Sequence, residues 1–200
     1  MKKSMLSTIA LSLVCLQGGH AAHASAGPLD GITSQLIAEN FPIANDIEVG
    51  TESAAVQTIA GCVQTKTFDI VENNASGQII VAVCKDGEFG PQNIDAAFAK
   101  RVADAKDAFK NLPPPAMQFM LAGLDPIVLP LENGRQGKAL TLPVVGHGFA
   151  LIPFAYALTP GKESTIVIQA YLNPNAPRNL SKPIGTLLQG IDKRLYQAVP

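Results

Sequence analysis

The stretch IIVAVC, residues 79–84, decides the fold of this 200-residue chain. Its side chains are apolar at odd and even positions alike, and β-branched residues dominate it. A short apolar run of this kind predicts a strand that is buried on both faces. We therefore expect a fully buried strand over residues 78–85.

The strand expected before it, over residues 56–71, is more polar. It carries Thr58, Thr65 and Asp69, so we expect it to be half exposed. Residues 72–77, with the sequence ENNASG, are rich in turn-forming side chains. The two strands are therefore predicted to form a hairpin.

Two cysteines, Cys62 and Cys84, lie on the two strands of this hairpin. If they oppose each other, Gln64 faces Ala82 and the hairpin closes near Asn73. Opposed residues lie about 4.5–5.5 Å apart at Cα, which is within reach of a disulfide. The pair lacks the C-x-x-C spacing of redox-active cysteines, so we expect a structural disulfide.

Apolar residues at steps of three and four predict three helices. The strongest pattern covers residues 92–112, with Asn93 as its N-cap. A shorter helix is expected after Asp30, which can cap it. The last helix is expected over residues 183–198, with Ser181 as a candidate cap.

The C-terminal half of the chain begins with a second predicted hairpin. Residues 127–131 and 139–145 flank Asn133-Gly134, and Asn-Gly is the strongest short signal for a hairpin turn. Glu132 and Arg135 are expected to face each other across this turn.

Two further strands are expected over residues 149–158 and 165–172, whereas the polar residues 45–53 are expected to form a connection. Pro130 and Pro143 cannot donate to a strand ladder, so part of the second hairpin should lie at a sheet edge or bulge. Strands and helices do not alternate, which favours the α+β class. We predict an antiparallel sheet of about six strands with helices packed on one side, and one hairpin stapled by the disulfide.

The first 26 residues have the layout of a secretory signal peptide. A basic start precedes a short apolar run, residues 6–16, and small residues with A-x-A sites that end at Ala24 and Ala26. A membrane-spanning helix needs roughly 20 apolar residues, so we expect a cleaved signal rather than an anchor. The remaining residues, 27–200, are expected to form one exported domain, in the periplasm or outside the cell.

The charge balance restricts the partners of this domain. Without Lys2 and Lys3, 13 of the 15 basic residues remain against 16 acidic ones, which leaves a net charge near −3. A nucleic-acid partner needs a basic face, so we expect none. We also expect no transmembrane segment in the mature chain. Cys15 lies deep in the apolar run and does not follow a small residue, which disfavours a lipid anchor.

His147 is the histidine that remains after removal of the signal, and it lies between Gly146 and Gly148. It is a candidate general base. The sequence places no nucleophile or orienting carboxylate beside it, so a turn histidine without catalytic function is the favoured interpretation. One histidine cannot form a multi-histidine metal site, and no nucleotide-binding motif is present. We therefore predict no catalytic residue, no metal and no cofactor.

Residues 144–158 contain no Asp, Glu, Lys or Arg. Bulky and small residues fall on opposite faces of the strand expected there. A central strand that is buried on both faces explains this pattern. Alternatively, the small-residue side leaves room for an apolar ligand or a protein partner, with Phe149, Leu151, Ala155 and Ala157 as the candidate surface.

Three functions are consistent with these features. We favour a non-catalytic exported protein that binds an apolar small molecule, a lipid or another envelope protein. The second is a periplasmic hydrolase that uses His147 with a carboxylate and a Ser or Thr. The third is a structural component of an envelope or secretion assembly. A cavity would favour the first function, catalytic neighbours of His147 the second, and a broad exposed apolar face the third.

Overall fold

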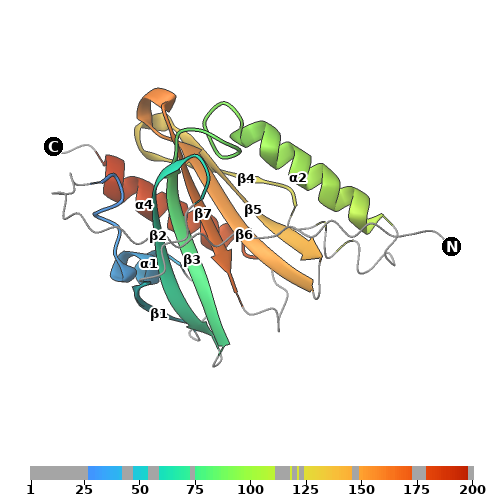
Figure 1. Ribbon diagram of the computed structural model, residues 1–200, viewed down its shortest axis with the longest axis horizontal. Coiled ribbons are helices and arrows are strands. Elements are labelled where there is room, and N and C mark those ends of the chain that lie inside the picture. Colours follow the sequence, from blue (N-terminus) through green and yellow to red (C-terminus); the bar gives the residue numbers. More distant parts are fainter. Residues whose placement is uncertain are drawn as a thin grey trace, which may run out of the picture.

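The computed structural model describes residues 27–41, 47–53, 59–72, 75–110, 118, 121, 124–145, 149–172 and 179–197 (Figure 1). Its seven strands form one sheet in the order β1-β2-β3-β7-β6-β5-β4. The strands are β1 Ile47–Glu52, β2 Cys62–Glu72, β3 Ala75–Cys84, β4 Ile127–Pro130, β5 Gln136–Val145, β6 Phe149–Leu158 and β7 Thr165–Tyr171. The helices are α1 Ser34–Asn40, α2 Ile94–Phe109 and α4 Ser181–Tyr196, with the 3-10 turns η1 Glu132–Gly134 and η2 Pro160–Lys162.

Two sequential meanders make up the sheet, β1 to β3 and β4 to β7. They join where β3 pairs with β7, so that Val81 faces Ile168. Residues 79–84 of β3 and 165–170 of β7 are all buried, as the uniformly apolar stretch of β3 predicts. All strand pairs are antiparallel, which confirms the predicted α+β class.

The helices cover both faces of the sheet, not one face as the sequence pattern suggests. α1 and α4 pack on the face that carries Val81, Ala155 and Ile168. α2 packs on the opposite face, against Phe154 and Tyr156, and lies along the β4–β5 end of the sheet (Figure 1). The reason is the apolar character of the central strands, because a strand that is apolar on both faces needs a covering layer on each.

β1 lies within the stretch that the sequence indicates as a connection. It is an edge strand with two acidic side chains. Glu48 is exposed, and Glu52 Oε2 forms an ion pair with Lys66 Nζ of β2 at 3.0 Å. Its pairing with β2 is irregular between Val49 and Glu52. Edge strands often carry charges and bulges that block pairing with a further strand. In β1 these features interrupt the alternation of apolar and polar residues by which a strand is recognised in a sequence.

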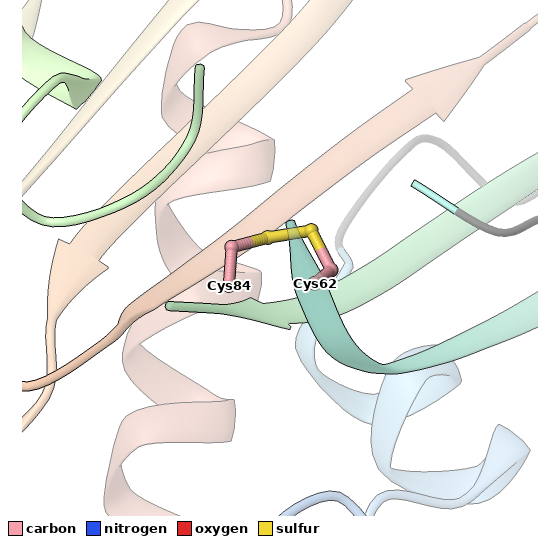
Figure 2. The surroundings of a disulfide bond; sticks show 2 residues. All are labelled: Cys62 and Cys84. Carbon is pink, nitrogen blue, oxygen red and sulfur yellow. A yellow bond between two sulfur atoms is a disulfide. The ribbon is translucent and has the colours of Figure 1, made fainter. Parts of the chain in front are cut away.

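A disulfide between Cys62 and Cys84 joins β2 to β3, as predicted (Figure 2). The predicted register holds only at the cysteines. A bulge directly after Cys62 leaves the exposed Val63 outside the ladder, so Gln64 faces Val83, one position away from the predicted pairing. The bulge inserts one extra residue in β2, and the periodicity of the sequence does not reveal it.

Asn93 occupies the N-cap position of α2 as predicted, but the side chains of all three predicted cap residues bind partners other than the helix N–H groups. Thr33, not Asp30, caps α1 with its hydroxyl, and Asp30 accepts a hydrogen bond within the segment before the helix. Asn93 is the N-cap residue of α2, but its side-chain amide donates a hydrogen bond to the Gly87 carbonyl in the preceding loop instead of capping the helix. Ser181 begins α4, and its buried hydroxyl lies 3.0 Å from that of Thr141. No helix among the described residues is long and apolar enough to span a membrane.

The β4–β5 hairpin is anchored to α4 by a buried ion pair. Asn133 and Gly134 adopt φ angles of 57° and 70° in its turn, the left-handed conformation that Asn-Gly favours. Arg135 does not pair with Glu132 across the turn. Its guanidinium binds Asp192 of α4, which is 1% exposed and also accepts the backbone N–H of Glu132 at 2.9 Å. One carboxylate therefore links the guanidinium and the backbone of the hairpin to the helix.

Candidate functional site

A groove with a volume of about 590 Å³ lies between α2 and the β4–β5 end of the sheet. Volumes of about 300–1,000 Å³ are typical of small-molecule sites. We call it the α2–β4 groove. It is lined by Asp95, Phe98, Ala99, Val102, Ala103, Lys106, Asp125, Pro126, Val128, Lys138 and Tyr156.

The α2 wall of the groove combines one buried ring with small exposed residues. Phe98 fixes the helix on the sheet, because its ring stacks on that of Tyr156 with centroids 4.5 Å apart. Ala99 and Ala103 follow one turn apart on an exposed side of α2. Their side chains are single methyl groups, so the helix can pack on the sheet and still leave space beside it.

The floor of the groove is a row of three side chains across the sheet. Val128 of β4 faces Lys138 of β5, which faces Tyr156 of β6. Val128 is 57% exposed, although it is aliphatic. An exposed valine beside a helix with small side chains gives the groove an apolar surface, and the methylene stem of Lys138 extends it.

One end of the groove is polar. Asp95, in the first turn of α2, accepts hydrogen bonds on Oδ1 from Lys138 Nζ at 2.6 Å and from Tyr156 Oη at 2.8 Å. The hydrogen bond from Lys138 holds the pKa of Asp95 below its usual value, so this group is a carboxylate at neutral pH. Burial, with the hydrogen bond to Asp95, raises the pKa of Tyr156, so its phenol stays protonated.

The other end of the groove carries a second, looser ion pair. Lys106 Nζ lies 3.6 Å from Asp125 Oδ1, and both side chains are at least half exposed. With Lys138 and Asp95 at the first end, the groove is lined by two cations and two anions. Its charges therefore cancel in pairs.

The outer edge of β4 offers few hydrogen-bond donors. The N–H of Leu131 donates to the Arg135 carbonyl at 3.0 Å, so by the period of two the odd-numbered residues of β4 face β5. The backbone groups of the even-numbered residues then point outward, at Pro126, Val128 and Pro130. Two of these three residues have no N–H. Proline at such positions blocks the pairing of a further strand on this edge.

The structure places part of the sequence-derived candidate surface away from this groove. Ala155 and Ala157 are 0% and 2% exposed and lie on the opposite face of the sheet, in the core beneath α4. The side chains of Phe149 and Leu151 lie outside the described part of the chain, as does His147.

The small residues on that face allow α4 to pack closely. A Cβ on Gly137, which faces Ala157, would lie 2.6 Å from Leu188 Cδ2 of α4. A Cβ on Gly185 of α4 would lie 2.7 Å from Leu129 Cδ1. The space beside these small residues is therefore occupied by the side chains of α4 and β4.

Replacing Ala157 by leucine should therefore lower the free energy of unfolding by about 1–3 kcal/mol, because three carbons must enter a filled core. Denaturant unfolding monitored by circular dichroism measures the change. Ala103→Leu on the exposed wall of the α2–β4 groove is the matched control and should change stability by less than about 0.5 kcal/mol. Equal stability of both variants would show that the face of Ala157 is open.

The sequence alone does not identify the residues of the α2–β4 groove as a site. Ala99 and Ala103 lie on the solvent side of a helix. Alanine is common there because it is a strong helix former, so its presence does not indicate a binding site. A useful signal was the pair of alanines four residues apart on a side that also carries Val102. Val128 does not indicate a site either, because a valine is an ordinary residue in a strand and its exposure cannot be read from the sequence.

The described residues contain no group of three or more His, Cys, Asp or Glu side chains that could hold a metal ion. Cys62 and Cys84 are joined in the disulfide and provide no thiol. Comparison with protein families, curated proteins and solved structures finds no match to this chain.

Proposed function

We propose that this chain is an exported, non-catalytic binding protein that holds an apolar small molecule in the α2–β4 groove. The observation that carries the proposal is the groove itself, a space of about 590 Å³ with Phe98, Val102 and Val128 among its lining residues. Export is supported by the signal-like N-terminus and agrees with a disulfide, because disulfides persist in oxidising compartments.

The protonation states in the groove support binding rather than catalysis. Asp95 is held as a carboxylate by Lys138, so it is a poor general acid. Tyr156 has a raised pKa and donates a hydrogen bond to Asp95 while keeping its proton, so it is a poor nucleophile. Both groups are arranged to stabilise each other, whereas a catalytic acid or base needs a pKa near the working pH.

The edge of β4 favours a small molecule over an extended peptide. A peptide that binds as an added strand gains its affinity from main-chain hydrogen bonds to the edge. Pro126 and Pro130 remove two of the three outward donors beside the groove. An apolar ligand needs none of these bonds, so the groove suits it better than it suits an envelope protein bound by strand addition.

Filling the groove should weaken binding without unfolding the protein. We expect Ala103→Phe to weaken binding of the neutral fluorescent dye N-phenyl-1-naphthylamine by about tenfold or more, because the ring occupies space that the ligand needs. Ala103 is exposed, so stability should change little. Fluorescence titration of the dye measures the affinity.

Ala96→Phe is the matched control for this experiment. Ala96 is exposed on the same helix and does not line the groove, so the substitution adds the same ring outside the site. Native mass spectrometry of the wild-type protein and both variants should show a co-purified ligand on wild type and Ala96→Phe only. Undiminished dye binding by Ala103→Phe would refute the groove as the binding site.

A further inference from the structure

We propose that Asp95 and Lys138 select, for the α2–β4 groove, an amphiphile with an uncharged head group that both donates and accepts hydrogen bonds, as a hydroxyl does. The inference rests on the proposed function and specifies the class of ligand. The apolar chain would lie along α2 toward Lys106, a distance of about 16 Å at 1.5 Å per residue. The head would lie beside the polar cluster at Asp95.

The hydrogen bonds of this cluster leave room for a hydroxyl. Asp95 uses one carboxylate oxygen, Oδ1, for both Lys138 and Tyr156. Its Oδ2 accepts no hydrogen bond from the described residues, and the side chain is 66% exposed. Lys138 gives one of its three N–H groups to Asp95 and is itself 41% exposed. A ligand hydroxyl can therefore donate to Oδ2 and accept from Lys138.

The paired charges disfavour a charged head. A carboxylate that approaches Lys138 also approaches Asp95, whose Oδ1 lies 2.6 Å from the Lys138 ammonium. An ammonium that approaches Asp95 meets Lys138 in the same way. At the far end of the groove Lys106 and Asp125 are also paired, so no excess charge of either sign favours an ion. An uncharged head meets neither repulsion.

The test compares three ligands with the same lauroyl-length chain below their micelle concentrations, each displacing N-phenyl-1-naphthylamine from the groove. The ligands are monolauroylglycerol, dodecanoate and dodecylammonium. We expect wild-type protein to bind monolauroylglycerol about tenfold more tightly than either ion, because an ion loses part of its hydration in the groove and the paired charges of Asp95 and Lys138 offer it no net attraction in return. Asp95→Asn should move the preference to dodecanoate, and Lys138→Gln should move it to dodecylammonium.

Asp104→Asn is the control, because it removes an exposed carboxylate of α2 that does not line the groove and should leave the order of the three ligands unchanged. Circular dichroism checks that each variant is folded. A wild-type preference for either ion, or an order that neither Asp95→Asn nor Lys138→Gln changes, would overturn the head-group assignment but leave the binding function intact. If wild type binds neither the dye nor any of the three ligands, the proposed function fails and this inference fails with it.

Discussion

Replacing Asp192 by alanine should lower the free energy of unfolding by about 3–5 kcal/mol, the usual cost of leaving one partner of a buried ion pair alone. Asp192 is 1% exposed and accepts hydrogen bonds on both oxygens, from the Arg135 guanidinium and from the Glu132 N–H. Removal of the carboxylate leaves the Arg135 guanidinium and the Glu132 N–H without this hydrogen-bond acceptor. Arg135 cannot turn to solvent freely, since it also donates to the Leu158 carbonyl at 2.8 Å and lies over the Tyr196 ring.

Urea unfolding at neutral pH measures this loss. Asp104→Ala provides the matched control, because its ion pair with Lys100 is exposed at 63% and 76% and should contribute less than about 0.5 kcal/mol. A second variant, Asp192→Leu combined with Arg135→Met, removes both charges together and should recover much of the lost stability. If Asp192→Ala were as stable as Asp104→Ala, the carboxylate would not anchor the β4–β5 hairpin to α4.

Replacing Cys62 and Cys84 together by alanine should have the second large effect, a loss of about 3 kcal/mol. The chain-entropy model gives this value for a loop of this size, because the reduced chain gains freedom when it unfolds. Cys84 is also fully buried against the core beneath α2, so its loss leaves a small void. For a domain of this length the change corresponds to a fall in Tm of about 6–12 °C.

Thermal unfolding with and without a thiol reductant measures the effect and contains its own control. Reductant should lower the Tm of the wild-type protein toward that of the double variant and should leave the variant unchanged. The α2–β4 groove lies away from the disulfide, so the folded double variant should still bind the dye. A wild-type Tm that reductant does not change would contradict a stabilising disulfide.

The elements that the sequence predicts well are those whose pattern is local. The sequence predicts β6 over residues 149–158, and the strand has these bounds. It predicts α2 over residues 92–112, and the helix covers Ile94–Phe109, because three- and four-residue spacing is a direct property of the helix. The Asn133-Gly134 turn also follows from its own two residues, since both adopt positive φ.

The features that the sequence does not predict depend on contacts between distant segments. The bulge at Val63 shifts the β2–β3 register, and β1 is recognisable only as the neighbour of β2. Arg135 finds Asp192 on α4 rather than Glu132 three residues away. The α2–β4 groove arises in the same way, because it is a space between a helix and an edge strand rather than a property of either.

The pairing of β3 with β7 has a consequence for the newly made chain. β3 ends at Cys84, whereas β7 begins only at Thr165, so one side of the apolar segment of β3, residues 79–84, stays without its neighbour until the C-terminal meander has emerged. Such an uncovered strand invites pairing with other copies. Both disulfide cysteines, by contrast, belong to the first meander, so oxidation can close its hairpin before the second meander arrives. A chain that stops before Thr165 therefore lacks the partner of this strand even when its hairpin is cross-linked.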